Sequence, residues 1–160
     1  MLINLEGVKK LINVLFVCMG NTCRSVMCEY IFKKMLKEKN LLNKISVNSC
    51  GICAFNNSPA AENVIKVIST FDQSIINHQA KILTIDSLKT SDYVFALDHT
   101  ILNYITQNFE VNDLCKINCI NSKGIPDPYG LSLSVYQNSA EEIKKSLKII
   151  LDKMIKDENL

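Results

Sequence analysis

The chain has no long apolar run and little excess charge of either sign. No stretch approaches the roughly 20 apolar residues that a membrane-spanning helix needs. The net charge is +2, from 18 basic and 16 acidic side chains. So small an excess does not predict a nucleic-acid partner or binding to an anionic membrane. Tryptophan is absent, and there are only three prolines and five glycines, so no linker rich in these residues divides the chain.

The length and composition are those of one globular domain. A chain of 160 residues can bury about two-thirds of its unfolded surface. Hydrophobic residues make up 48% and charged residues 21%, which excludes a disordered, collagenous or coiled-coil chain. The first ten residues place an acid and a glycine before the lysines, an order unlike a secretory signal. We therefore expect a cytoplasmic protein.

The seven cysteines are an odd number, so a closed set of disulfides would leave one over. Without a secretory signal, reduced thiols are the expected state. Two spacings, Cys50-x-x-Cys53 and Cys115-x3-Cys119, leave a structural zinc site open. The paired pattern of a zinc knuckle is absent, which makes zinc the weaker interpretation.

Hydrophobic patterning predicts strands alternating with helices. The run Ile12–Cys18 is almost wholly apolar and is typical of a strand buried on both faces. Further strands are expected over residues 45–49, 92–97 and 114–120. Helices are expected from Ser25 as N-cap, from a first turn at Pro59 to about Phe71, up to about residue 108, and over residues 134–156. This order predicts an α/β fold with a parallel sheet, helices on both faces and ligands at the carboxyl ends of the strands.

The loop after the first strand contains a cysteine and the single arginine of the chain. Cys18 ends the strand, five residues follow, and Arg24 precedes the helix. A guanidinium can bind two phosphate oxygens at once, which lysine cannot do. Backbone N–H groups of such a loop, together with a helix N-terminus, form an anion site. Thiols near helix N-termini and cations have pKa values of about 3.5–7.5, so the loop predicts a reactive thiolate at Cys18.

Other residues of this loop can support the same chemistry. Gly20 permits a positive φ or a close approach to the anion, Asn21 can brace the loop, and Ser25 can donate a hydrogen bond to the thiolate. The loop has neither Gly-Lys-Ser/Thr nor G-x-G-x-x-G, so a nucleotide or dinucleotide site is not predicted. Nothing in the sequence places His78 or His99 beside Cys18 as the base of a Cys/His hydrolase.

A thiolate that attacks phosphorus needs an acid to protonate the leaving group. Asp127 follows the fourth predicted strand and lies between two prolines, in Gly-Ile-Pro-Asp-Pro-Tyr-Gly. Because the carboxyl ends of parallel strands share one edge of the sheet, we expect Asp127 near Cys18. An ordinary turn is the alternative interpretation of this segment.

Cys18-x5-Arg24-Ser25 together with Asp127-Pro128-Tyr129 resembles the low-molecular-weight protein tyrosine phosphatases. The resemblance implies a four-stranded parallel sheet in flavodoxin-like order and metal-free phosphate hydrolysis in two steps, without a cofactor, on a phosphorylated protein. It implies that residues 1–11 are an N-terminal extension to a phosphatase domain of residues 12–160. The implied site comprises a nucleophile, Cys18; a phosphate ligand, Arg24; an acid and base, Asp127; the phosphate-loop residues Met19, Gly20, Asn21, Thr22, Cys23 and Ser25; the supporting residues Ser49 and His78; and a pocket wall, Tyr129.

The resemblance also implies that Cys23 can form a reversible disulfide with Cys18. Thr22 is similar to the residue of the phosphoarginine-specific bacterial type, whereas a bulky aliphatic side chain there resembles the phosphotyrosine type. Phosphotyrosine and phosphoarginine therefore both stay open as substrates. Two other classes also stay open: a thiol-dependent arsenate reductase and a non-catalytic phosphate-binding module. Val26 and Cys28 depart from the residues usual in the family, and we expect neither to disable the loop.

Overall fold

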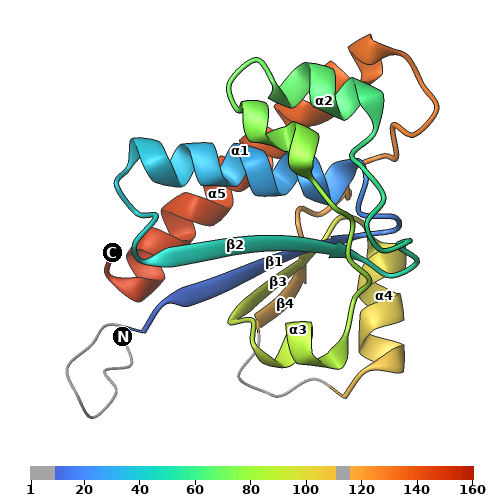
Figure 1. Ribbon diagram of the computed structural model, residues 1–160. Helices are drawn as coiled ribbons and strands as arrows, with labels where there is room; N and C mark the ends of the chain where they lie inside the picture. Colours follow the sequence, from blue (N-terminus) through green and yellow to red (C-terminus); the bar gives the residue numbers. More distant parts are fainter. Residues whose placement is uncertain (1–9, 111–115) are drawn as a thin grey trace.

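The computed structural model describes residues 10–110 and 116–160, so Cys115 and most of the expected N-terminal extension lie outside the described residues. Four parallel strands form one sheet in the order β2-β1-β3-β4, which confirms the predicted α/β fold (Figure 1). The strands are β1 (Ile12–Cys18), β2 (Ile45–Gly51), β3 (Tyr93–Ala96) and β4 (Lys116–Cys119). Their carboxyl ends share one edge, where the reversal of strand order between β1 and its two neighbours opens a crevice.

Helices cover both faces of the sheet (Figure 1). The long helices α1 (Arg24–Glu38) and α5 (Leu133–Glu158) pack on one face together with α2 (Glu62–Ile68). The opposite face carries α3 (Ile85–Lys89) and α4 (His99–Asn108), and a short 3₁₀ helix, η1 (Gln73–Asn77), follows α2. In the described residues, no helix is both long and apolar enough to cross a membrane.

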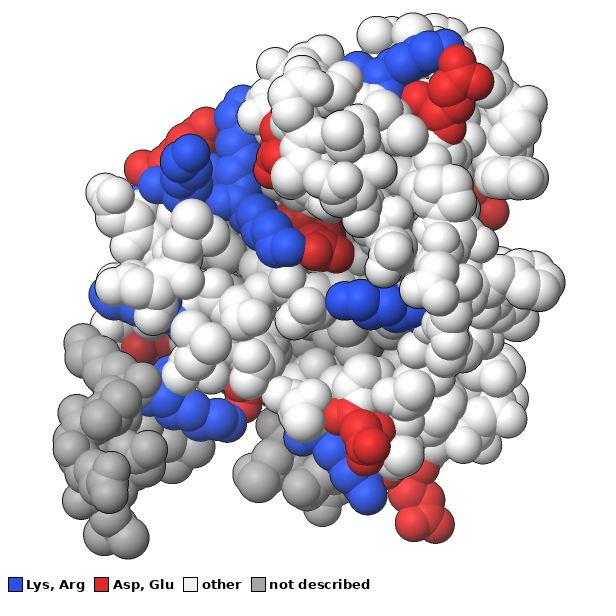
Figure 2. All heavy atoms as spheres, viewed as in Figure 1, with Lys and Arg blue, Asp and Glu red and all other residues white. Residues whose placement is uncertain are grey.

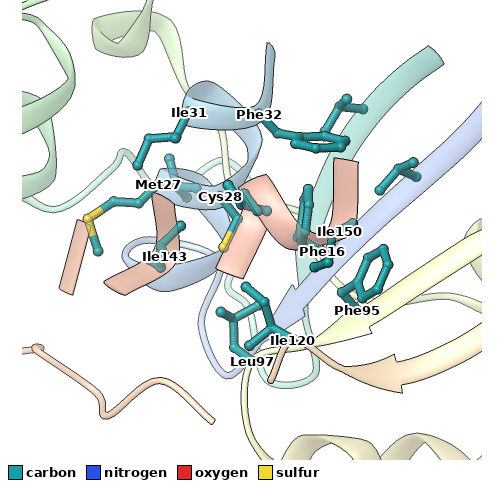
Figure 3. Packing of buried hydrophobic residues seen from close by; sticks show 14 of the residues in the cluster. Phe16, Met27, Cys28, Ile31, Phe32, Phe95, Leu97, Ile120, Ile143 and Ile150 are labelled. Carbon is teal, nitrogen blue, oxygen red and sulfur yellow. The ribbon is translucent and has the colours of Figure 1, made fainter. Parts of the chain in front are cut away.

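Alternation along β1 divides the core in two. Val14, Phe16 and Cys18 face α1 and α5, whereas Leu15 and Val17 face α3 and α4. Figure 3 shows Phe16 at the centre of the larger core, where its ring stacks on Phe95 at 5.7 Å and meets the edge of Phe32 at 5.7 Å. All five residues from Val14 to Cys18 are buried, so β1 is fixed from both faces and its carboxyl end is a rigid base for a site.

Two predicted helix starts are wrong. Helix α1 begins at Arg24, not with Ser25 as its N-cap, and Cys23 at the N-cap makes no side-chain capping bond. Helix α2 begins at Glu62 and ends at Ile68, so Pro59 precedes it and Phe71 follows it. In both places a residue that is typical of a helix start has another role. The Ser25 hydroxyl contacts Cys18, and Pro59 lines a cavity.

The surface shows no region of one charge sign around the first helix. In Figure 2, lysines over α1 lie beside acidic side chains, and Lys33 pairs with Glu29 and Lys34 with Glu38 one turn along the helix. Glu141, Glu142, Lys144 and Lys145 are exposed on α5, as expected of a solvated helix face.

Candidate active site

Cys18 ends the central strand, and the phosphate loop (residues 18–25) carries the chain from β1 into α1. The Cys18 Sγ atom lies 2.9 Å from Ser25 Oγ and 3.3 Å from the backbone nitrogen of Asn21. The Asn21 amide donates to the sulfur, and the Ser25 hydroxyl lies within hydrogen-bonding distance of it. Sequence reasoning expected both Asn21 and Ser25 in this loop, and the structure places both against the sulfur.

Asn21 joins the loop to three other segments. Its side-chain nitrogen donates to Ser25 Oγ at 3.0 Å and to Ser49 Oγ at 2.8 Å, and its Oδ1 accepts from the Lys81 amide at 2.8 Å. The Nε2 atom of His78 lies 2.9 Å from the Asn21 carbonyl oxygen. Ser49 and His78 therefore contact the loop through Asn21, and neither reaches the thiol itself.

The positive φ of the loop falls at Asn21, with φ 52°, so Gly20 does not use the first of the two roles that its sequence position allowed. Asparagine tolerates this region better than other residues because its short side chain can hydrogen-bond locally. A close backbone contact that requires glycine occurs at Gly51, at the end of β2. A Cβ there would lie 2.6 Å from the Met19 carbonyl oxygen and 2.7 Å from the Asn21 nitrogen. Gly51 is thus a loop-packing residue that sequence reasoning missed.

The hydrogen bonds around Asn21 restrict the direction in which each hydroxyl can donate. Ser49 donates to Glu29 Oε2 at 2.5 Å, because a carboxylate can only accept. The Ser49 oxygen is then left to accept from Asn21, whose second amide proton goes to Ser25. Ser25 accepts from Asn21 and keeps its own proton, which it can donate to Cys18 Sγ. Glu29, which was not singled out from the sequence, is the acceptor at the far end of this chain of hydrogen bonds.

Arg24 is 4% exposed and is held before any ligand binds. Its Nη1 donates to Asp98 Oδ2 at 2.6 Å and to the Ile125 carbonyl oxygen at 3.0 Å. Burial would raise the pKa of Asp98, but hydrogen bonds from the Ile101 amide and from Arg24 outweigh it and lower that pKa. Asp98 also caps α4, through the Ile101 amide at 2.8 Å. It is a second residue that sequence reasoning missed.

Asp127 lies across from the thiol on the acid loop (residues 124–131). The Ile125 amide donates to the Leu97 carbonyl at 2.7 Å, which anchors the start of this loop to the end of β3. The Asp127 side chain is 48% exposed, and its Oδ2 is 3.5 Å from Arg24 Nη2. Its Oδ1 accepts from the Tyr129 amide at 3.2 Å. The carboxyl group thus reaches both solvent and the guanidinium.

One cavity of about 490 Å³ brings these groups together. Cys18, Arg24 and Asp127 all line it, as do Thr22 and Tyr129. The lining also includes Phe55, which is 83% exposed and was not singled out from the sequence. Met19, Gly20 and Cys23 of the phosphate loop and Cys53 are further lining residues.

The structural zinc site that two cysteine spacings left open finds no support among residues 10–110 and 116–160. No three His, Cys, Asp or Glu side chains gather there in a way that could hold a metal ion. Cys50 is buried in the smaller core, whereas Cys53 is exposed at the cavity. The pair Cys115 and Cys119 falls partly outside the described residues. His99 is exposed, and its ring lies 2.9 Å from the Ser122 carbonyl.

Comparison with known proteins agrees with this geometry. Residues 13–160 match the family described as low molecular weight phosphotyrosine protein phosphatase. The chain belongs to this family. It is an enzyme, a phosphatase of the cysteine-dependent type.

Relatives named as arginine phosphatases and relatives named as tyrosine phosphatases match this chain at similar sequence identity. The protein-arginine-phosphatase of Bacillus subtilis is 28% identical over 91% of this chain and 98% of its own length. The low molecular weight protein-tyrosine-phosphatase PtpA of Staphylococcus saprophyticus is 29% identical over 94% and 98%. The crystal structure of a low molecular weight protein tyrosine phosphatase from T. tengcongensis superimposes with a TM-score of 0.81 at 31% identity, over 89% of this chain and 99% of the other.

Proposed function

We propose that this phosphatase hydrolyses phosphorylated side chains of cytoplasmic proteins through a phosphoryl group carried on Cys18. The observation that carries the proposal is that Cys18, Arg24 and Asp127 open on one cavity, with Arg24 already oriented by Asp98. A thiol, a fixed guanidinium and a half-exposed carboxyl group supply a nucleophile, a phosphate ligand and an acid.

In the first step the Cys18 sulfur attacks phosphorus while the bond from phosphorus to the leaving oxygen or nitrogen breaks. Asp127 gives its proton to the leaving atom, and Arg24 with the loop amides binds the equatorial phosphate oxygens. In the second step Asp127, now a carboxylate, takes a proton from water as the water attacks phosphorus. The S–P bond breaks, inorganic phosphate leaves and the thiolate, held by Ser25, is regenerated.

Within this function, Thr22 favours phosphoarginine as the substrate. Thr22 lines the cavity and offers a hydroxyl where an aliphatic side chain would offer only bulk. A hydroxyl can hydrogen-bond a guanidinium nitrogen of the substrate, whereas a phenyl ring makes no use of it. Phosphotyrosine is the second candidate, since relatives named for tyrosine are as similar as the one named for arginine.

The test is phosphate release from two peptides of one sequence, carrying phosphoarginine or phosphotyrosine, without added metal. We expect release from the wild-type protein and none from Cys18→Ser, which should still bind phosphate. The Thr22→Val variant keeps the shape of the side chain and removes the hydroxyl. It should slow phosphoarginine hydrolysis several-fold and leave phosphotyrosine hydrolysis unchanged.

Other results would overturn specific parts of the proposal. If the folded, reduced protein releases no phosphate from either peptide, a non-catalytic phosphate-binding module is the better interpretation. If it consumes thiols only when arsenate is present, a thiol-dependent arsenate reductase is the better interpretation. An equal effect of Thr22→Val on both peptides would remove Thr22 as the residue that selects the substrate.

A further inference from the structure

Glu29 lies in the second turn of α1, and its carboxyl group points from the helix to the neighbouring strand β2. Its side chain is only 13% exposed. One oxygen, Oε1, pairs with Lys33, and the other, Oε2, accepts from Ser49 Oγ at 2.5 Å. A carboxylate so little exposed is tolerated because both oxygens are hydrogen-bonded. The two chemical steps at Cys18 assign no role to this group.

The carboxylate determines what the Ser49 hydroxyl can do. Ser49 is 4% exposed and has a single proton, which goes to Glu29 because a carboxylate can only accept. The Ser49 oxygen then accepts from Asn21 Nδ2 at 2.8 Å. Because the hydroxyl donates on one side and accepts on the other, the Ser49 side chain is held in one orientation.

Removing the carboxylate would take away the acceptor of a buried proton. A buried hydroxyl without a partner is costly, so the Ser49 side chain should rotate towards another acceptor and its oxygen should leave Asn21. The same Asn21 nitrogen donates to Ser25 Oγ at 3.0 Å, and that oxygen lies 2.9 Å from Cys18 Sγ. A shift of Asn21 would therefore change the position of the hydroxyl beside the sulfur.

We propose that Glu29 is a positioning residue for the nucleophile. By accepting the Ser49 proton, it fixes Asn21. Asn21 in turn keeps the Ser25 hydroxyl within hydrogen-bonding distance of the Cys18 sulfur. The inference rests on the proposed function of Cys18 as the nucleophile. Glu29 touches neither the substrate nor the reacting atoms.

An effect of the Glu29 charge alone would have the opposite sign. A negative carboxylate disfavours a nearby thiolate by repulsion, so removing only the charge should make Cys18 more reactive. Removing the positioning group should make Cys18 less reactive. Glu29→Gln separates the two explanations, because glutamine removes the charge and keeps an oxygen that can accept the Ser49 proton. Its NH2 group then faces Lys33, which is 40% exposed and can turn to water.

The test compares Glu29→Ala with Glu29→Gln by two measurements. The first is kcat/KM on an aryl phosphate with a good leaving group. The second is the rate at which iodoacetamide alkylates Cys18 at one neutral pH, followed by mass spectrometry of the peptide that contains it. In Glu29→Ala both rates should fall about three- to tenfold, the scale of one hydrogen bond. In Glu29→Gln both should stay within about twofold of wild type or rise, because the acceptor is kept.

Two further variants separate positioning from general damage to the helix. Glu38→Ala also removes a glutamate that pairs with a lysine one turn away on α1, but that pair is exposed, and the variant should behave like wild type. Ser49→Ala should lower both rates as Glu29→Ala does. In the Ser49→Ala background, Glu29→Ala should have no further effect, because the proton that it accepts is gone. Circular dichroism establishes that each variant is folded.

Distinct outcomes bear on the inference and on the proposed function. The positioning role is wrong if Glu29→Ala leaves Cys18 alkylation unchanged or faster, if Glu29→Gln is impaired as much as Glu29→Ala, or if the loss persists in Ser49→Ala. Alkylation of Cys18 is measured without any turnover. If the wild-type enzyme hydrolyses no phosphate ester, or Cys18→Ser is fully active, the proposed function itself fails.

Discussion

The two loops that meet at the cavity are held in very different ways. In the phosphate loop Asn21 is 0% and Arg24 4% exposed, and hydrogen bonds reach them from four other segments. In the acid loop the Asp127 side chain is 48% exposed and its contact with Arg24 is long. The phosphate loop is assembled before substrate arrives, whereas the Asp127 carboxyl group of the acid loop can exchange protons with water.

The difference follows from what each loop must do. Stabilising phosphate charge is most effective when donors are fixed in advance, because no reorganisation is then needed during the reaction. An acid must take up a proton from water between turnovers and reach the leaving atom of each substrate. A buried, rigid Asp127 could do neither, so an open acid loop beside a rigid phosphate loop fits the two-step reaction.

The largest effect should come from Asn21, because its loss breaks the rigid loop. Asn21→Ala removes three side-chain hydrogen bonds and forces alanine into φ 52°. We expect turnover to fall about 10²–10³-fold and the free energy of unfolding to fall by about 2–4 kcal/mol. Steady-state kinetics and urea unfolding measure the two effects.

Asn21→Gly is the matched control, since glycine adopts the positive φ without strain. It should recover part of the stability and little of the turnover. Wild-type turnover in Asn21→Ala would show that the network does not support the thiolate.

The next effect should come from Asp127 and should separate activity from stability. Asp127→Ala should lower turnover on poor leaving groups at least about tenfold while changing the free energy of unfolding by less than about 0.5 kcal/mol, because the side chain is half exposed. Asp127→Asn, which keeps the shape and cannot donate the proton, should match it. An unchanged rate in either variant would remove Asp127 as the acid.

A smaller effect should come from Asp98, which holds Arg24 on one side and caps α4 on the other. Asp98→Asn can still cap the helix with its amide oxygen, but it then turns its NH2 group towards the guanidinium in place of an acceptor. Phosphate should therefore bind several-fold more weakly, with only a small loss of stability. Asp98→Ala should also lose about 0.5–2 kcal/mol of stability with the cap. Calorimetric titration with inorganic phosphate gives the affinity. Equal affinity in Asp98→Asn and wild type would mean that Arg24 is oriented without Asp98.

The smallest effect is the dependence of stability on pH. Because the pKa of Asp98 is lowered in the folded protein, the unfolded chain takes up this proton first as the pH falls. The stability that Asp98 adds over Asp98→Asn is therefore complete above the ordinary aspartate pKa of about 3.9 and is lost as the pH falls through the folded value. Urea unfolding of both proteins between neutral and acidic pH measures the difference. A difference that grows towards acid would contradict the assigned direction.

The sequence predicted the residues whose spacing is local. Cys18, Arg24 and Ser25 lie within one short segment, and the apolar pattern of β1 placed that segment at the edge where ligands bind. Asp127 was found because its strand ends at the same edge. The two misplaced helix starts, at Ser25 and Pro59, show where local signals failed, because Ser25 instead contacts the Cys18 sulfur and Pro59 lines the cavity.

The residues that the sequence did not reveal act across long separations. Asp98 is 74 positions from Arg24 along the chain and is one of 16 acidic residues, so nothing local marks it. Gly51 meets Met19 only once β2 lies beside β1. Glu29 is 20 positions from Ser49, to which it is hydrogen-bonded across α1 and β2. Only the assembled sheet brings these partners together.

The central claim is that Cys18 carries the phosphoryl group between the two steps. The Asp127→Ala variant should accumulate this intermediate on a substrate with a good leaving group, since the first step then needs no acid and the second lacks its base. Rapid acid quenching and mass spectrometry of the peptides give the measurement. The account predicts one added phosphoryl group on the peptide that contains Cys18, absent in the double variant with Cys18→Ala. Turnover without any such adduct, or an adduct on another residue, would contradict it.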